Sequence, residues 1–335
     1  MPVMSSTKNA PSANRARFTI IAVVFVLGLM VGQYTNNFLP GAPKSYNDFT
    51  DLTQGYHFID PLLFCSDREM TGQTAEYSQR LENELTDLIE EHKKLGLISE
   101  ASVLYRDLSN GPRVSVNGEL GSAPASLLKV PLALSIHRRV ESDPSFLQRK
   151  VMMNMPDQNA GEYFMAPKKA EFGVEYTIDE LLDLSLINSD NNATDLLISQ
   201  LTDEELRKSY VDLGIKVPID NPNAYTMNVA VYSSFFRILY NSSYLSRENS
   251  ERFLANLSKS TFTQGLVAGV PPGTTVSHKF GEYSAGDGFK QLHDCGIVYK
   301  AKQPYLLCVM TQGDDFEKLA KTIQNISRKV WDLDE

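Results

Sequence analysis

The sequence predicts an α+β domain with an antiparallel five-stranded sheet, flanked by an N-terminal and a C-terminal helix and interrupted by an inserted all-helical lobe. Three observations support this class. A helical pattern is followed by two short β-prone runs, a long stretch of helical patterns comes next, and three more β-prone runs precede a final amphipathic helix. We expect the domain over residues 74–335 and the helical lobe over about 126–270.

The first elements follow from apolar spacing and from helix stop signals. Residues 74–95 have a helical apolar spacing, with acidic residues early, two lysines late and Gly96 as a stop. The β-prone runs 101–105 and 114–116 flank an Asn-Gly-Pro turn at residues 110–112. This arrangement predicts a hairpin directly after the first helix.

The inserted lobe contains several helix starts. A helix is expected over residues 126–141, and capping-box sequences at Thr177-x-x-Glu180 and Thr202-x-x-Glu205 predict two more. The last helix carries an apolar stripe that is expected to pack on the sheet. The remaining elements, in chain order, are helices over 231–240 and 247–257, strands over 274–279, 290–300 and 304–311, and a helix from about Asp314.

The N-terminal segment differs from the rest of the chain in charge and hydropathy. Residues 18–32 contain no charged side chain, three basic residues precede them, and no base follows until Lys44. Because basic flanks stay on the cytoplasmic side, we expect a cytoplasmic tail over 1–17, a single-pass transmembrane signal-anchor over 18–34 and an extracytoplasmic linker over 35–73. The missing Ala-x-Ala cleavage site favours an anchor in the cell membrane; cleavage of a signal peptide followed by secretion is the alternative.

The rest of the chain is acidic. Four of the 32 basic residues and none of the 41 acidic ones lie in the first 45 positions, so the remaining residues have a formal charge of −13. A nucleic-acid-binding surface needs basic residues that displace counterions from phosphates. We therefore expect no nucleic-acid partner, and contact with the membrane only through the N-terminal helix.

Histidine and cysteine usage predicts neither a metal nor another cofactor. The five histidines form no His-Glu-x-x-His sequence, and the three cysteines form no Cys-x-x-Cys sequence. The cysteines permit at most one disulfide. Two pairings stay open: Cys65 with Cys295, which would tie the linker to the domain, or Cys295 with Cys308 across adjacent strands.

Three short motifs carry the functional prediction. The S-x-x-K sequence at 126–129 begins a helix, where residues three apart share a face, so the lysine amine can reach the serine hydroxyl and take its proton. The S-D-N sequence at 189–191 lies in a break between helices, and the K-F-G sequence at 279–281 lies on an expected strand. Each motif alone is weak, but their combination in this order is specific.

In this order the motifs resemble those of the penicillin-recognising serine enzymes, and residues 74–331 resemble a class A β-lactamase-type serine hydrolase. The resemblance implies an amide hydrolase, β-lactamase-like or D,D-peptidase-like, that forms an acyl-enzyme on its serine. It implies no cofactor. The substrate would be a β-lactam or a peptidoglycan-derived peptide of the D-Ala-D-Ala type.

The resemblance also implies a role for each matching residue. Ser126 would be the acylated nucleophile, Lys129 its base or proton relay, and Ser189 the donor of a proton to the leaving nitrogen. The backbone N–H groups of Ser126 and Glu282 would form the oxyanion hole. Asp190 would hold its own loop. Asn191 and Lys279 would have both catalytic and substrate-binding roles: Asn191 would hold Lys129 and a substrate amide, and Lys279 would add positive charge for the substrate carboxylate and for the proton relay. Gly281 and Glu282 would also bind substrate.

The sequence departs from the family pattern in three places. A class A β-lactamase activates its deacylating water with a glutamate on the Ω loop, yet between residues 206 and 247 the only acidic residues are Asp212, on an expected helix, and Asp220. Phe280 replaces a Thr or Ser that binds the substrate carboxylate, and its side chain faces either the pocket or the core. The following strand lacks the usual arginine, which leaves Lys290 and His293 as substitutes.

These departures leave three functions compatible with the motifs. The first is a serine hydrolase in which Ser126 is acylated and deacylation is slow. The second is a true β-lactamase with a non-standard deacylation base, for which Asp220 is a candidate. The third is a non-hydrolytic sensor that binds cell-wall fragments or β-lactams.

Overall fold

The computed structural model describes residues 56–61, 72–109, 112–218, 225–301 and 303–333. All of them belong to one compact unit, Gly55–Glu335. Within these ranges no helix combines the length and the apolar character that a bilayer span requires. The expected anchor at 18–34 lies outside the described residues.

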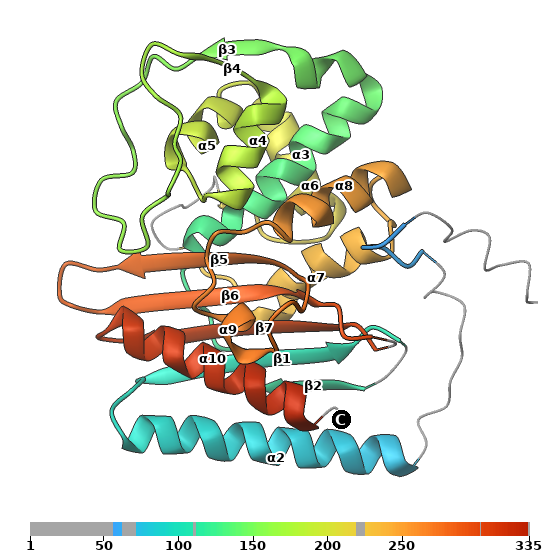
Figure 1. Cartoon of the computed structure of the whole chain (residues 1–335), viewed down its shortest axis with the longest axis vertical. Helices are drawn as coiled ribbons and strands as arrows, with labels where there is room; N and C mark the ends of the chain where they lie inside the picture. Colours follow the sequence, from blue (N-terminus) through green and yellow to red (C-terminus); the bar gives the residue numbers. More distant parts are fainter. Residues whose placement is uncertain (1–55, 62–71, 110–111, 219–224, 302, 334–335) are drawn as a thin grey trace, which may run out of the picture. The chain divides into compact units, whose positions relative to one another are not determined.

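A five-stranded antiparallel sheet forms the centre of the domain (Figure 1). Its strand order is β2-β1-β7-β6-β5, so the chain leaves the sheet after β2 and returns at the opposite edge with β5. The expected hairpin is confirmed, and so is the α+β class. The strands are β1 (Glu100–Asp107), β2 (Arg113–Val116), β5 (Val276–Ser284), β6 (Lys290–Val298) and β7 (Tyr305–Gly313).

The sheet is buried on both faces: eight of the nine residues of β6 and seven of the nine of β7 are buried. On β7, Leu307 and Val309 join one core, whereas Leu306, Cys308 and Met310 join the other. This alternation follows from the period of two in a strand. Two packed cores therefore hold the sheet between the terminal helices and the inserted lobe.

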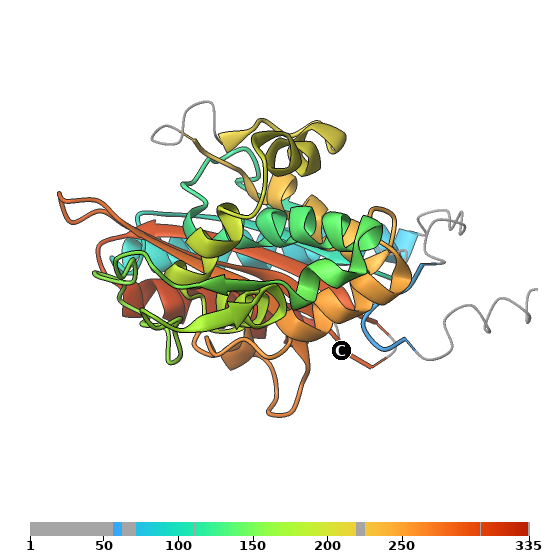
Figure 2. The same cartoon turned by 90° about the horizontal axis from the view of Figure 1, so that it is seen from above.

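The first core lies under the N-terminal and C-terminal helices, α2 (Gly72–Lys94) and α10 (Phe316–Leu333). Helix α10 packs on β6 and β7, on the face opposite to α7 (Figures 1 and 2). Helix α2 ends at Lys94, and the expected stop residue Gly96 follows it with a φ of +66°, the left-handed conformation that glycine tolerates.

The second core joins the sheet to the helical lobe. Both expected capping boxes are present, at Thr177 and at Thr202. A two-stranded ribbon was not anticipated; its strands have three residues each, too few to show a sequence pattern. The lobe comprises η3 (Ala125–Leu128), α3 (Lys129–Ser142), η4 (Pro144–Gln148), β3 (Lys150–Met152), β4 (Glu175–Thr177), α4 (Ile178–Ile187), α5 (Asn191–Ile198), α6 (Asp203–Asp212), α7 (Val229–Tyr240) and α8 (Arg247–Leu257). Helix α9 (Leu266–Gly269), at the end of the range expected for the lobe, instead packs on α10, and its Leu266 joins the first core.

A disulfide and a docked segment complete the domain. Cys295 and Cys308 face each other in the β6–β7 ladder and form a disulfide inside the second core, which settles the pairing in favour of adjacent strands. Cys65 lies outside the described residues. Residues 56–61, part of the expected linker, contact the domain: the backbone N–H groups of His57 and Phe58 donate to the Glu251 carboxylate at 2.6 and 2.8 Å.

Candidate active site

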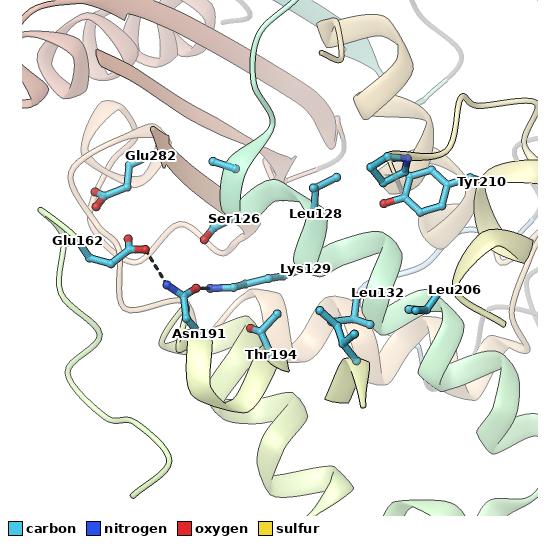
Figure 3. Close-up of a pocket in the computed structure, with 13 residues that line it drawn as sticks. Ser126, Leu128, Lys129, Leu132, Glu162, Asn191, Thr194, Leu206, Tyr210 and Glu282 are labelled. Carbon is cyan, nitrogen blue, oxygen red and sulfur yellow. Dashed lines mark hydrogen bonds between the residues drawn. The ribbon is translucent and has the colours of Figure 1, made fainter. Parts of the chain in front are cut away.

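The nucleophile motif lies at the start of α3. Residues 125–128 form a single 3₁₀ turn before the α-helix, and Ala125 has a φ of +49°, an uncommon conformation for a residue with a Cβ. Lys129 is the first residue of α3 and is only 3% exposed. Ser126 and Lys129 line the same pocket, with the lysine side chain running below the serine (Figure 3).

The S-D-N motif lies in the turn between α4 and α5. Ser189 has a φ of +60° and is buried. The Asp190 carboxylate caps α5 by accepting from the backbone N–H groups of Asn192 and Ala193, and it also accepts from Asn159 Nδ2. The expectation that Asp190 holds this loop is confirmed. Its hydrogen bonds fix the strained turn that places Ser189 and Asn191 beside Lys129.

The K-F-G motif lies on β5, next to the turn that carries the nucleophile. A Cβ on Gly281 would lie 2.8 Å from the Pro124 carbonyl oxygen and 3.0 Å from the Leu127 nitrogen. Only glycine lets β5 approach this turn so closely. Lys279, which precedes Phe280 on β5, is fully buried. Its Nζ donates to the Phe280 carbonyl oxygen at 2.8 Å.

The three motifs converge on the Ser189 hydroxyl. Lys129 Nζ lies 3.1 Å from Ser189 Oγ and Lys279 Nζ lies 3.0 Å from it. Lys129 Nζ also donates to Asn191 Oδ1 at 2.7 Å and to the Ser189 carbonyl oxygen at 2.5 Å. Two amines and one hydroxyl thus form a connected path along which a proton can move.

Burial tunes both lysines toward their neutral forms. Desolvation lowers the pKa of Lys129 to about 8, although Glu162 and other carboxylates oppose this shift. Desolvation, with a smaller contribution from the charge of Lys129, lowers the pKa of Lys279 well below its ordinary value. An amine that loses its proton near neutral pH can accept one from a serine hydroxyl.

The pocket has a volume of about 430 Å³ and two chemically different ends (Figure 3). Its polar end is formed by Lys129, Asn191, Glu162 and Glu282. Its apolar end lies between α3, α5 and α6, and is lined by Leu128, Leu132, Thr194, Ile198, Leu206, Tyr210 and Pro218. No carboxylate lines the apolar end within the part of the chain that the structure describes. Ser126 stands between the two ends.

The expected oxyanion residues both line the pocket. Ser126 belongs to the η3 turn and Glu282 to β5, and these two elements pack against each other. The role of their backbone N–H groups toward a substrate stays a prediction. Among the described residues, no group of three or more His, Cys, Asp and Glu side chains is arranged to hold a metal ion.

Phe280 faces the core. Its ring stacks on Phe262 with centroids 4.2 Å apart, and it is 4% exposed. The two candidates for a substitute cation are also placed elsewhere. His293 is buried, its Nε2 lies 3.0 Å from the Ala123 carbonyl oxygen, and burial lowers its pKa to about 4, which makes it neutral. Lys290 Nζ donates to the Asp314 carbonyl oxygen, and neither residue lines the pocket.

The structure describes one of the two acidic residues between positions 206 and 247. Asp212, at the end of α6, accepts from Lys208 and Tyr244, and the hydrogen bond from Lys208 lowers its pKa. It is thus held on the surface of the domain, as expected for a solvated helix face. Asp220 lies outside the described residues.

Sequence reasoning missed Glu162. This residue comes from the irregular segment between β3 and β4, and its Oε1 accepts from Asn191 Nδ2 at 2.7 Å. It lines the pocket opposite Ser126 (Figure 3). A single glutamate in a segment without regular spacing gives no motif, so nothing in the sequence marked it.

Comparison with known proteins agrees with this geometry. Residues 80–333 match the model of the β-lactamase enzyme family. No curated protein sequence matches the chain significantly. The TLA-3 extended-spectrum β-lactamase superposes with a TM-score of 0.65 at 19% identity, covering 76% of this chain and 98% of that one.

Two further solved structures show the same fold. A class A β-lactamase from Mycobacterium abscessus has a TM-score of 0.62 at 23% identity, covering 75% of this chain and 98% of its own. A mutant of PBP-A, in an acyl-enzyme complex with penicillin G, has a TM-score of 0.59 at 23% identity, with coverages of 74% and 96%. Because the family model covers most of the domain, the chain belongs to the β-lactamase enzyme family.

Proposed function

We propose that this protein is a membrane-anchored serine hydrolase that forms an acyl-enzyme on Ser126 with β-lactams or with D-Ala-D-Ala-like amides of the cell wall. The observation that carries the proposal is the convergence of Lys129 and Lys279 on the Ser189 hydroxyl, at 3.1 and 3.0 Å. A structural lysine gains nothing from burial beside a second buried lysine. Such an arrangement serves proton transfer.

The reaction follows from the positions of these groups. Lys129, neutral in an appreciable fraction at pH 7, takes the Ser126 proton as the oxygen attacks the substrate carbonyl. The N–H groups of Ser126 and Glu282 stabilise the oxyanion, and each such donor typically lowers the barrier by about 3 kcal/mol. Ser189 then gives its proton to the leaving nitrogen and recovers one from Lys129 or Lys279.

Deacylation is the slow step. The ester on Ser126 needs an activated water, and the pocket next to it is lined by leucines, an isoleucine, a tyrosine and a proline. Apolar side chains neither orient a water nor accept its proton. The acyl-enzyme therefore accumulates. Export by the N-terminal segment, with residues 1–17 in the cytoplasm, would place the domain where cell-wall amides occur.

Acyl-enzyme formation is tested by labelling the full chain with a fluorescent penicillin. We expect one label per molecule on Ser126, and no label on the Ser126→Ala variant. Intact-protein mass spectrometry over time then gives the lifetime of the adduct. A chain that stays unlabelled at millimolar penicillin while it remains folded by circular dichroism would falsify the proposal.

One observation favours a second candidate, a β-lactamase with a non-standard deacylation base. Glu162 is a carboxylate in the pocket, held beside Asn191. Nitrocefin separates the two functions: a single burst per enzyme molecule supports the slow acyl-enzyme, and sustained turnover that Glu162→Gln removes supports the β-lactamase. A burst followed by an adduct that persists for hours is the behaviour of a sensor.

A further inference from the structure

The segment between β3 and β4 reaches from the helical lobe to the sheet. Residues 156–170, called the 156–170 loop below, extend along the lobe toward β5 (Figure 1). At β5 the backbone N–H groups of Tyr163 and Phe164 donate to the two oxygens of the Glu282 carboxylate, at 2.5 and 3.0 Å. The loop is therefore fixed to the strand that carries the K-F-G motif.

An aromatic cluster under the loop explains why Phe280 stands where threonine is usual in the K-F-G motif. The Phe164 ring packs edge-on against Phe262 at 5.0 Å and against Phe280 at 6.1 Å between centroids. Tyr163 packs on Phe316 and donates its hydroxyl to Glu317. Phe280 thus gives up contact with substrate and supports the loop instead.

The docked loop brings a second carboxyl group to the pocket. Glu162 accepts from Asn191 Nδ2 at 2.7 Å and lies within hydrogen-bonding reach of Glu282, and both line the pocket beside Ser126 (Figure 3). Burial, and then the contact with Glu162, raise the pKa of Glu282 to about 7. Two carboxyl groups thus lie side by side at this end of the pocket, and the negative charge of each opposes a further anion there.

The pocket offers little positive charge to balance the pair. Lys279 is fully buried, and its amine is engaged by Ser189 and Phe280. Lys290 and His293 do not line the pocket. A substrate carboxylate placed beside Ser126 would therefore meet two acidic groups, with Lys129 as the only cation lining the pocket among the described residues.

We propose, on the basis of the acyl-enzyme function above, that Glu162 and Glu282 determine specificity by selecting an amide substrate that carries an ammonium group beside the scissile carbonyl and by rejecting a carboxylate there. The carboxyl pair supplies hydrogen-bond acceptors and negative charge at a fixed site. The substrate class is then a cell-wall amide whose diamino-acid residue presents its free amine to the pocket, and ordinary penicillins acylate Ser126 at a disadvantage.

At a given pH, the other charged side chains around the pair carry the same charge whichever of the two substrates is offered. Lys129 and Lys279 face it from α3 and β5, Asp190 and Asp195 act on Lys129 from the S-D-N turn and α5, and Asp315 and Glu317 act on Tyr163 near α10. Protonation of Lys129 at low pH slows acylation by every substrate alike. The ratio of two acylation rates at one pH removes this common effect, and the change of that ratio in Glu162→Gln at the same pH separates the carboxyl pair from the charge of Lys129.

The experiment compares benzylpenicillin, which is an anion, with its 2-aminoethyl amide, which ends in an ammonium. Acylation rate constants of the full chain are measured by intact-protein mass spectrometry at pH 8 and at pH 6. We expect the amide to react about tenfold faster at pH 8, since Glu282 is then mostly ionised, and this ratio to fall at pH 6, where Glu282 gains a proton and Lys129 gains charge. The neutral methyl ester, of intermediate rate, controls for size.

Variants assign the discrimination to the pair. Glu162→Gln keeps an acceptor for Asn191 while removing a charge, and should bring the amide-to-penicillin ratio close to one, as should Glu282→Gln. Glu317→Gln removes a carboxylate that holds the same loop outside the pocket and should leave the ratio unchanged. A wild-type ratio of one or less, or a ratio that Glu162→Gln does not lower, overturns the proposal.

Binding to the Ser126→Ala variant separates this proposal from the proposed function. Dissociation constants for both probes are measured by calorimetry with this variant, in which no acylation can occur. If the ammonium probe binds more tightly but neither probe acylates the wild-type chain, the specificity stands and the acyl-enzyme function fails. If both probes acylate Ser126 at the same rate, the specificity fails and the acyl-enzyme function stands.

Discussion

The polar and apolar ends of the pocket offer the same serine different chemistry. At the polar end, Lys129, the proposed base, donates to Asn191 Oδ1 at 2.7 Å, and both residues line the pocket with Ser126. At the apolar end, Leu132 and Tyr210 exclude water and supply no base. The comparison teaches that forming an ester on Ser126 and hydrolysing it are separate tasks, and it underlies the proposal that this chain performs the first faster than the second.

The largest expected effect comes from removing the base at the polar end. Lys129→Met keeps the length and burial of the side chain but has no amine, so the acylation rate should fall by about 10²- to 10⁴-fold. In the wild-type chain the neutral amine is the active form. The acylation rate should therefore rise with pH through about 8 and level off above it. Stopped-flow labelling across pH 6–10 measures both effects.

Lys279→Met serves as the control for this substitution. It removes the other buried amine of the path and should reduce acylation less, because Lys129 still reaches Ser189. If Lys129→Met retained full acylation with the same pH profile, Lys129 would not be the base.

A smaller effect is expected from a substitution at the apolar end, because that substitution changes the pKa of Lys129 at the polar end. Leu132 lies one helical turn from Lys129 and is buried in the pocket wall. Leu132→Asn admits water, so the desolvation that lowers the Lys129 pKa weakens. The midpoint of the acylation profile should move up from about 8 by as much as one unit, which lowers acylation at pH 7 by up to about tenfold.

The lifetime of the acyl-enzyme gives the second readout for this change. Water at the apolar end should shorten the lifetime, as followed by mass spectrometry. Leu132→Met, which keeps the end apolar, is the matched control and should change neither quantity. An unchanged midpoint together with an unchanged lifetime in Leu132→Asn would show that the two ends act independently.

The same contrast explains what the sequence predicted and what it did not. The hairpin, the terminal helices and the three motifs follow from spacing and capping, because each depends on residues close together in the chain. The strand order does not follow from such signals, because β1 pairs with β7, near the other end of the domain. Glu162 depends on a long loop that docks through Phe164 onto Phe280, two residues far apart in the sequence. The orientation of Phe280 was open for the same reason: its partners lie on other elements.

The smallest expected effect compares two helices that begin with the same capping box. Thr202 caps α6, which carries Leu206 and Tyr210 of the apolar end, whereas Thr177 caps α4, which contributes no residue to the pocket lining. Replacing either threonine with alanine should cost about 1 kcal/mol of unfolding free energy, measured by urea titration. Only Thr202→Ala should also shorten the acyl-enzyme lifetime, because a frayed first turn of α6 loosens Leu206. Equal lifetimes in the two variants would mean that the first turn of α6 does not control the access of water to the apolar end of the pocket.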